Sequence, residues 1–339
     1  MNRDTRIVIA ALATATAVVS TATWQTVVHL PGAATAAAAT PVTHTGTQTK
    51  LAAATKGLKM RMAPSATRAQ PYGTHALGYK LDHGVKVFHL TAERARWRID
   101  AHTVASAWTY NRQVPGPLLR FRHGDRVRIV VTNKLSEPTA VHWHGLEVPN
   151  GMDGVPGVTM KPIRPGGSFS YEFTVTNAPG LFIYHPHYDT MKQEGLGMFG
   201  AIVVDPASGP DRKLHEVFQL LSSLNGSFLI NGKSFPSTDT YSVRRGSKLL
   251  IRAINMDTMM NHPMHLHGLS FREVGINGGT VPRRLQYPVS EQDIAPGETY
   301  DMLLTATEKG VWLYHCHNLS HVTGPGGTDA GMITVLKVL

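Results

Sequence analysis

Cysteine is almost absent from this sequence, since Cys316 is the only one in 339 residues. One thiol cannot close an intramolecular disulfide, which excludes the disulfide-stapled class of small secreted scaffolds. Charged residues are few, at 17%, and no basic run resembles a nucleic-acid-binding motif despite a formal net charge of +10. We therefore expect no nucleic-acid partner and interpret the charge as a solvated basic surface. The alternative is attraction to an acidic polymer, a cell wall or a lipid surface.

Long apolar runs are also absent after the N-terminus, so no later segment is expected to span a membrane. Residues 1–40 combine two early arginines, an apolar stretch and the small residues of "AATAAAAT", which is the layout of a secretory signal. The alternative is an uncleaved membrane anchor. Residues 41–72 are rich in Ala, Thr, Lys and Arg, and we expect them to form a flexible leader. The protein is thus expected to be secreted, periplasmic or at the cell surface.

The body of the chain contains an internal repeat. Residues 111–145, which end in "TAVHWHG", are matched by residues 231–268, which end in "NHPMHLHG". Each copy has turn residues, an alternating apolar strand and a final His-X-His-Gly. Short strands, frequent turn signals and little helical periodicity favour an all-β fold with two antiparallel β-sandwich or barrel domains. We place these domains at residues 73–208 and 209–339.

Histidines recur in pairs that are two residues apart. Residues two apart on a strand point to the same face, so the two imidazoles of each pair project together. One such pair is most often surface decoration or a satisfied core pair, but four pairs at matching positions of a repeat favour a metal site. The pairs are His142 with His144, His185 with His187, His265 with His267, and His315 with His317.

A second set of possible ligands has the opposite parity. Cys316 lies between His315 and His317, so its sulfur should point away from their imidazoles. His262 lies three residues before a paired histidine, and His321 lies five residues after Cys316. Cys316, His262 and His321 form the Cys-plus-two-His ligand set of a blue copper centre, which a weak axial Met often completes. Met332 is the candidate for that Met.

The motifs "HWHG", "HPH", "HPMHLHG" and "HCHNLSH", in this order, resemble the multicopper oxidases, and specifically the two-domain bacterial laccase-like members. The resemblance covers roughly residues 85 to 339 and implies cupredoxin-like domains that bind four copper ions per chain. It implies His262, Cys316, His321 and Met332 at type 1 copper, His142 and His265 at type 2, and two type 3 sets, namely His144, His185 and His317, and His187, His267 and His315.

The same resemblance implies a mechanism. A small reducing substrate gives single electrons to the type 1 copper by way of His321, and Cys316 carries them to a trinuclear cluster that reduces O₂ to water. "MDGVPGVT" makes Asp153 the proton-relay candidate, although Asp153 could equally be a turn residue before Gly154. Two features depart from the family pattern: Ser320 replaces a common Glu, and a Gly-Pro-Gly-Gly insertion delays Met332.

Because the eight paired histidines come from both domains, their cluster should lie between domains. In two-domain relatives the domains of neighbouring subunits meet head to tail, so we expect a homotrimer. Phenols or aromatic amines are the preferred donors, and Cu(I), Mn(II) or Fe(II) is the alternative. Copper nitrite reductase fits less well, because that family has its blue site in the first domain. A non-enzymatic copper carrier also fits less well, although "NMDTMMNHPM" (255–264) could handle Cu(I) rather than pack around His262.

Overall fold

A computed structural model describes residues 75–211 and 213–339. The expected signal (1–40) and leader (41–72) lie outside the described residues. Strands dominate the described chain, as the sequence predicted. Its helices are one short α-helix and four 3₁₀ turns: α2 (Thr190–Gly195), η1 (Asn150–Met152), η2 (Arg283–Leu285), η3 (Leu319–His321) and η4 (Pro325–Gly327).

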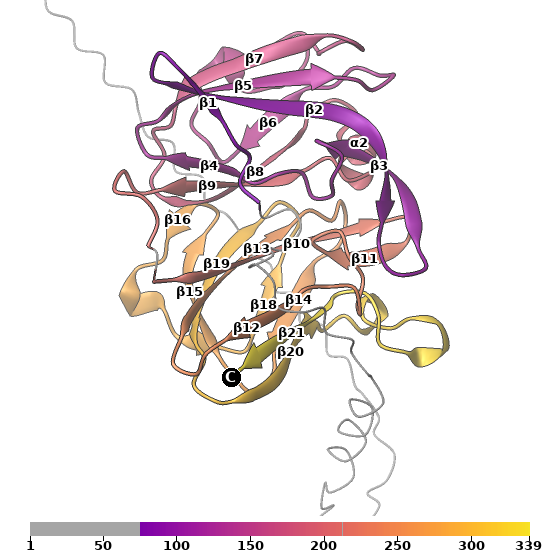
Figure 1. Ribbon diagram of the computed structural model, residues 1–339, viewed down its shortest axis with the longest axis vertical. Helices are drawn as coiled ribbons and strands as arrows, with labels where there is room; N and C mark the ends of the chain where they lie inside the picture. Colours follow the sequence, from indigo (N-terminus) through magenta and orange to yellow (C-terminus); the bar gives the residue numbers. More distant parts are fainter. Residues whose placement is uncertain (1–74, 212) are drawn as a thin grey trace, which may run out of the picture. The chain divides into compact units, whose positions relative to one another are not determined.

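The first half of the described chain forms two sheets (Figure 1). One sheet has the order β1-β2-β5-β7, with β3 also paired to β2, and the other has the order β4-β9-β8-β6. The bounds of the first sheet are β1 (Lys80–Asp82), β2 (Val85–Arg98), β3 (Val104–Tyr110), β5 (Arg126–Asn133) and β7 (Ser168–Thr174). Those of the second are β4 (Leu119–Arg122), β6 (Val141–His144), β8 (Gly180–Pro186) and β9 (Gly200–Asp205).

The second half repeats this plan with a larger first sheet. That sheet has the order β11-β10-β13-β19-β15-β16, with β17 on β15: β10 (His215–Leu224), β11 (Ser227–Ile230), β13 (Lys248–Asn255), β15 (Phe271–Ile276), β16 (Gly279–Thr280), β17 (Pro288–Val289) and β19 (Thr299–Thr305). Its partner has the order β12-β21-β20-β14-β18: β12 (Thr240–Val243), β14 (His262–Leu266), β18 (Glu291–Ile294), β20 (Gly310–Cys316) and β21 (Ile333–Val338).

Corresponding strands pair in the same way in both halves. β2 runs parallel to β5 as β10 does to β13, and β4 runs parallel to β9 as β12 does to β21. The sheets are therefore mixed, and the expectation of purely antiparallel domains was wrong. Parallel neighbours need a crossover connection, and other strands do lie between the two members of each pair in the sequence. Hairpin spacing alone gave no sign of these crossovers.

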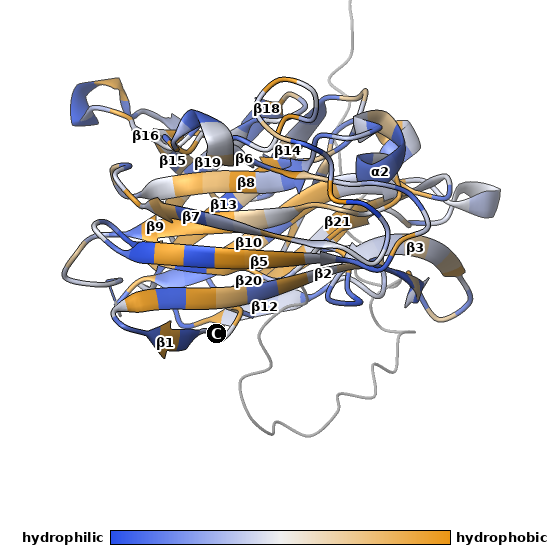
Figure 2. Cartoon of the chain, turned by 90° about the horizontal axis from the view of Figure 1, so that it is seen from above, coloured by the Kyte–Doolittle hydropathy of each residue, from blue (hydrophilic) through white to orange (hydrophobic). Residues whose placement is uncertain are grey.

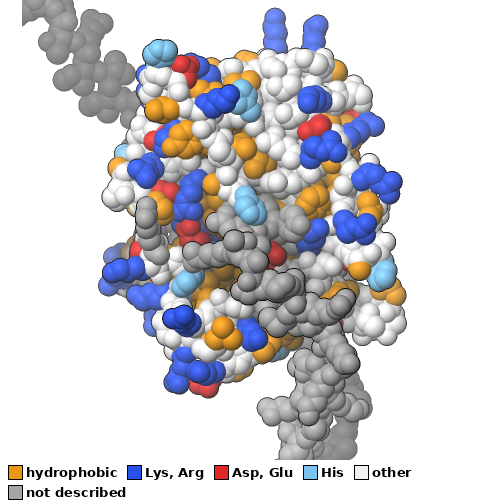
Figure 3. Space-filling model, viewed as in Figure 1, with side chains coloured by type: hydrophobic (Ala, Val, Ile, Leu, Met, Phe, Trp, Pro, Cys, Tyr) orange, Lys and Arg blue, Asp and Glu red, His pale blue; other side chains and the backbone are white. Residues whose placement is uncertain are grey.

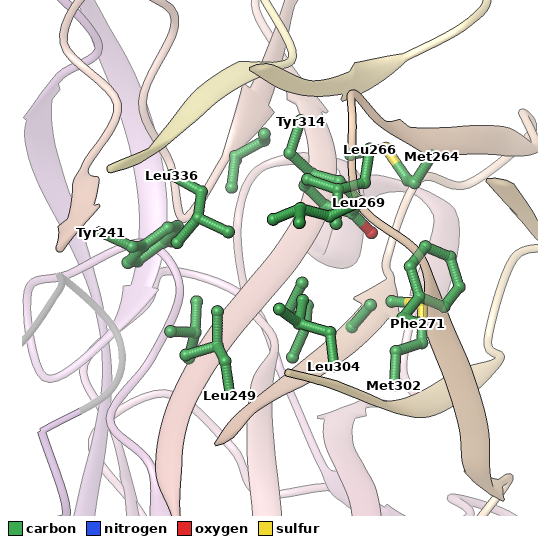
Figure 4. Close-up of a cluster of buried hydrophobic side chains, with 14 of the residues drawn as sticks. Tyr241, Leu249, Met264, Leu266, Leu269, Phe271, Met302, Leu304, Tyr314 and Leu336 are labelled. Atoms are coloured by element: carbon green, nitrogen blue, oxygen red, sulfur yellow. The ribbon is translucent and has the colours of Figure 1, made fainter. Parts of the chain in front are cut away.

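Side-chain alternation places apolar residues of the strands between the two sheets of each half. Figure 2 shows the alternation of polar and apolar residues along β5. In the second half, Met264, Leu266 and Tyr314 are buried with Leu336 in a single core, and Figure 4 shows them pointing toward one another. Since Met264 and Leu266 lie on β14 and Tyr314 lies on β20, the opposite faces of these two strands are left free for other side chains.

The two halves contact each other through apolar and charged side chains. An apolar cluster combines Ile183 and Phe199 of the first half with Leu220 and Ile254 of the second. A hydrogen bond 2.6 Å long from Trp97 Nε1 to the Gly232 carbonyl also joins the halves. These contacts fix the position of β8 and β9 against β10 and β13.

Beside this cluster runs a chain of ion pairs. Arg120 donates two 2.7 Å hydrogen bonds to Asp205 and one to Glu216, which also accepts from Arg252, and Arg252 pairs with Asp301. Burial by itself would raise the pKa of Glu216, but the hydrogen bond from Arg120 holds it below the usual range. Its contribution to stability is therefore present at neutral pH and lost as the pH falls through that lowered pKa. Asp301 has the opposite effect on stability. Burial raises its pKa, so keeping it ionised at neutral pH disfavours the folded state.

Replacing Arg120 with leucine should lower the free energy of unfolding by about 3 kcal/mol, because buried Asp205 would lose its partner and Glu216 would lose its ion pair with the first half. Arg128→Leu is the matched control, since the partners of Arg128, Asp82 and Glu172, are far more exposed and such pairs contribute about 0–1 kcal/mol. Denaturant unfolding of both variants measures the difference. Equal midpoints would show that the ion-pair chain does not hold the halves together.

Charge is dispersed on the surface that Figure 3 shows, where Lys and Arg side chains are scattered over both halves. This scatter agrees with the interpretation of the net charge of +10 as a solvated surface. Within residues 75–211 and 213–339, no helix is both long and apolar enough to cross a membrane.

Candidate metal centres

Cys316 lies at the end of β20 and points into the core of the second half, where it is fully buried. The register pairs it with Met264 on β14, two residues from His262. His262 shares the inward face of β14, and η3 turns the chain so that His321 faces the same pocket. The three side chains have exposed fractions of 0%, 0% and 2% for Cys316, His262 and His321. The predicted convergence of this set is present.

The donor atoms of these side chains match the spacing of a metal site. The Nδ1 atoms of His262 and His321 are 3.1 Å apart, and Cys316 Sγ lies 3.8 Å and 3.5 Å from them. A point equidistant from the three atoms lies about 2.0 Å from each, close to the ~2.0–2.3 Å of metal–nitrogen and metal–sulfur bonds. Thiolate with imidazole suits a soft transition metal such as copper. The residues present therefore fit the ion that the sequence implied.

Burial shifts the pKa of both the thiol and an imidazole of this ligand set in the metal-free chain. It raises the pKa of the Cys316 thiol to about 11, and it lowers the pKa of His321, with a smaller effect from His262. The His321 imidazole is thus neutral and ready to bind at pH 7, whereas the thiol must release its proton when a metal binds.

Met332 is fully buried next to this pocket. Its amide donates to the His321 carbonyl at 2.9 Å, and its carbonyl accepts from the Cys316 amide at 3.1 Å. Gly331, with φ of 73°, allows this approach, because a Cβ there would lie 2.0 Å from the His321 oxygen. Despite the Gly-Pro-Gly-Gly insertion before it, Met332 remains bonded to the two residues whose metal it would share.

Three neighbours of the pocket escaped the sequence reasoning. Phe228 on β11 stacks on His321, with ring centroids 3.8 Å apart, and Asn318 Nδ2 lies 3.3 Å from His321 Nε2. Asp257 Oδ2 lies 3.8 Å from His262 Nε2, and neither of these two atoms makes a hydrogen bond. Asp257 lies in the same Met-rich segment as His262 and could have been found from it. Phe228, which comes from a distant strand, carried no signal.

The four paired histidines of the first half form one cluster on the outer face of β6 and β8, here called the first quartet: His142, His144, His185 and His187. His144 Nδ1 lies 3.4 Å from His185 Nε2, and donor atoms of these two and of His142 lie within 4.8 Å of one another. Burial lowers the pKa of His144, so its imidazole is neutral at pH 7. This arrangement can hold a metal ion.

The second quartet occupies the matching face of β14 and β20: His265, His267, His315 and His317. The Nε2 atoms of His267 and His315 are 2.9 Å apart. Burial lowers the pKa of both imidazoles, and neighbouring histidines lower it further. His267 and His315 are therefore neutral at pH 7, and the quartet offers a second set of imidazole ligands on the face opposite to Cys316.

Backbone carbonyls orient several of these imidazoles through Nδ1. His142 contacts the Asp153 carbonyl at 2.9 Å, His265 contacts the Ser290 carbonyl at 3.0 Å, and His315 contacts the Cys316 carbonyl at 2.8 Å. A proton on Nδ1 leaves Nε2 as the metal-binding atom, which is a common outer-sphere device in metal sites. The contact between His315 and the Cys316 carbonyl also joins the second quartet to the buried pocket through a single residue.

Within residues 75–211 and 213–339, no hydrogen bond or ring contact joins a histidine of one quartet to a histidine of the other. Each quartet also remains partly open to solvent: His144, His187 and His317 are exposed. The eight paired histidines therefore form two separate groups of four, each with side chains still open to solvent.

Asp153 follows η1 and lies beside the first quartet. Besides the contact of its carbonyl with His142, its Oδ1 lies 3.3 Å from the same Nδ1. Gly154 is needed there, since its φ is 87° and a Cβ would lie 1.8 Å from the Val141 carbonyl. Asp153 thus holds the turn before Gly154 and also places its carboxylate beside the first quartet, while its role as a proton relay stays a prediction.

The first half has no counterpart of the thiolate pocket. Pro186, which pairs with Val141, takes the place that Cys316 has opposite Met264. Thr139, the counterpart of His262, instead donates a 2.7 Å hydrogen bond to buried Gln193. A neutral hydrogen bond thus fills the space that the ligand set fills in the second half.

Together these features define a β-sandwich protein with a buried Cys-plus-two-His pocket and two histidine quartets. Two family models, both described as multicopper oxidase, match residues 91–209 and 210–338. The blue copper oxidase of Nitrosomonas europaea has a similar fold, with a TM-score of 0.70 at 28% identity over 74% of this chain and 85% of that one. The chain belongs to the multicopper oxidase family, and its domains are cupredoxin-like.

Two curated relatives give the range of similarity. Copper resistance protein A of Escherichia coli is 28% identical over 263 residues, covering 58% of this chain and 42% of its own length. Multicopper oxidase MmcO of Mycobacterium tuberculosis is 42% identical over 107 residues, covering 32% of this chain and 20% of its own length. The chain thus matches less than half the length of either relative.

Proposed function

We propose that the protein is a laccase-like multicopper oxidase with cupredoxin-like domains at residues 73–208 and 209–339. It would couple one-electron oxidation of phenolic or aromatic donors to the reduction of O₂ to water. The observation that carries this proposal is the opposite orientation of Cys316 and its neighbours: the sulfur lies in the buried pocket, while His315 and His317 belong to the second quartet.

The proposed copper sites combine the side-chain clusters with the ligand sets that the family resemblance implies. His262, Cys316 and His321, with Met332, would hold type 1 copper. The pairs with facing nitrogens, His144 with His185 and His267 with His315, each supply two ligands of one type 3 ion. The full assignment adds His317 to the first pair, His187 to the second, and His142 with His265 at type 2. When bound, copper supplies the one-electron acceptor and the site of O₂ reduction.

The reaction balances with a monophenol as donor: four phenols each lose one electron and one proton to become phenoxyl radicals, and one O₂ becomes two waters. The chain's own residues shield the pocket from water, orient the imidazoles through backbone carbonyls and connect Cys316 to His315. Steady O₂ consumption by copper-loaded protein with a phenol tests the proposal. Stoichiometric copper binding without turnover would instead indicate a copper carrier.

A homotrimer is part of the proposal, because each quartet has half of the ligands and remains partly open to solvent. The first quartet of one subunit would face the second quartet of its neighbour, and a ring of three closes such a head-to-tail contact. Copper nitrite reductase remains less suitable, since the thiolate pocket lies in the second half.

Oxidation of Cu(I), Mn(II) or Fe(II) is the second candidate, and one observation favours it. The buried Asp257 carboxylate accepts hydrogen bonds from the amides of Met259 and Met260, whose side chains are 75% and 44% exposed. Carboxylate and thioether groups beside His262 could bind a metal ion. O₂ uptake measured side by side with a phenol and with each metal ion separates the two candidates.

Asp153→Asn should slow O₂ turnover about tenfold or more while the blue colour remains, because an amide cannot carry a proton to the first quartet. Glu147→Gln, a change of an exposed carboxylate in the same connection, is the control and should have no effect. Stopped-flow reoxidation of reduced enzyme by O₂ isolates this step. Unchanged reoxidation in Asp153→Asn would leave this residue with its turn role alone.

We also propose that the protein acts outside the cytoplasm, as the composition of residues 1–40 indicates. Fractionation of cells that produce the full chain, with N-terminal sequencing of the mature protein, tests this localisation.

A further inference from the structure

The burial of the pocket prevents direct contact between its metal ligands and an electron donor in solution. Its three donor side chains are at most 2% exposed, so an organic donor in solution cannot touch His262, His321 or Cys316 directly. The sequence had suggested His321 as the entry point, but in the structure another side chain covers its ring. Any donor must therefore pass its electron through a neighbouring group.

Phe228 contacts both imidazoles of the pocket. It stacks on His321 at 3.8 Å between centroids with 27° between the planes, and it lies 6.3 Å from His262 at 75°. Phe228 itself is partly exposed, although it packs against the core of the second half. One face is thus occupied by His321, and the ring lies between the pocket and solvent.

The fold fixes Phe228 in this position. Asn225 and Gly226, both with positive φ, form the two-residue turn of the β10–β11 hairpin, and Phe228 pairs with Ser223 just beyond it. Such hairpins have a fixed register, so Phe228 keeps the same position relative to His321. A rigid aromatic ring over a buried imidazole is a suitable platform for stacking a second aromatic molecule.

We propose that Phe228 is the donor-contact residue of this protein, and that a planar aromatic donor stacks on its exposed side and passes its electron across the Phe228–His321 stack. The proposal rests on the oxidase function above. Each monophenol that binds there loses one electron to the pocket and one proton to solvent, leaving a phenoxyl radical that departs. Four such events supply the electrons that one O₂ requires.

The surroundings favour uncharged donors. The exposed residues between the second quartet and His321 are Asn318, Leu319 and Ser320, none of which carries a charge, and Leu319 is 66% exposed. Neutral phenols and aromatic amines are therefore the substrate class, and their oxidation should be insensitive to ionic strength. Asp257 lies 3.8 Å from His262 and accepts from the amides of Met259 and Met260, so metal-ion donors would approach the pocket along this segment.

The test compares copper-loaded wild type, Phe228→Leu and Phe169→Leu. Phe169 is a matched control, since it is also partly buried and packs on an aromatic ring, Tyr171, at 4.7 Å in the first half. We expect Phe228→Leu to lower kcat/KM for 2,6-dimethoxyphenol about tenfold, because the stacking surface is lost. Hexacyanoferrate(II), a donor without a ring, should change less than about twofold, and the blue absorption should remain.

Equal loss with both donors, or no loss with either, would overturn the proposal. Absence of O₂ uptake by wild type with any donor would instead refute the oxidase function itself. If Phe228→Leu loses its colour, binding of benzamide, a redox-inert aromatic, to wild type decides the matter. Nuclear Overhauser contacts from benzamide to the Phe228 ring in the metal-free chain are expected, and their absence would refute the platform.

Discussion

Copper-loaded Cys316→Ser is expected to be colourless and to lose O₂ uptake with every donor, by about a thousandfold or more. A serine hydroxyl is a poor ligand for a soft metal, and the replacement removes the sulfur that lies 3.5 Å and 3.8 Å from the two imidazole nitrogens. The backbone contact of His315 with the carbonyl of residue 316 remains, but no sulfur is left to join that residue to a metal in the pocket. Absorption spectra and oxygen-electrode traces of the two proteins measure the effect.

The eight paired histidines provide the internal control for this variant. They lie on the opposite faces of their strands, so Cys316→Ser should keep the copper that they bind and should unfold at nearly the wild-type denaturant concentration. Retained colour, or normal O₂ uptake, would mean that the thiol is an inert core residue. Loss of all copper would mean that the quartets depend on the pocket in a way that the geometry does not indicate.

The second large effect is a gain of activity on mixing two inactive chains. One chain carries His144→Ala and His185→Ala and lacks the facing pair of the first quartet. The other carries Cys316→Ser. In a head-to-tail ring, about a quarter of the contacts would join an intact first quartet to an intact second half, so co-produced chains should regain about a quarter of wild-type turnover.

The matched control co-produces His144→Ala and His185→Ala on separate chains. Both changes fall in the same quartet, so no contact can combine intact partners and activity should stay at background. If the Cys316→Ser mixture also stays inactive although mixed assemblies form, the quartets do not complete each other between subunits. Light scattering should give the mass of three chains, and an active monomer would contradict the trimer.

Much of the candidate site follows from the sequence because it depends on a local rule. The alternation of a strand decides that Cys316 and His315 face opposite ways, whatever the rest of the chain does. The strand register also places Pro186 opposite Val141 as it places Cys316 opposite Met264, as expected for two copies of one repeat. The prediction of an all-β fold class was also confirmed, because short alternating strands are present in both halves.

Contacts between distant segments and the atomic details of the imidazoles could not be predicted from the sequence. The parallel pairs of β2 with β5 and β10 with β13 arise from crossovers that leave no mark on local periodicity. Phe228 reaches His321 from a strand that is distant in the sequence, and no spacing rule connects the two. The choice of Nδ1 or Nε2 also depends on carbonyl partners that the fold alone brings close.

Anomalous X-ray scattering at the copper edge, from crystals of copper-loaded protein, examines the opposite orientation of Cys316 and its neighbours most directly. One peak should lie among His262, Cys316 and His321, and three more should lie where the first quartet of one subunit meets the second quartet of another. Density at the quartets with none beside the Cys316 sulfur, or copper bound by one quartet alone, would contradict the arrangement of ligands inferred from these strands.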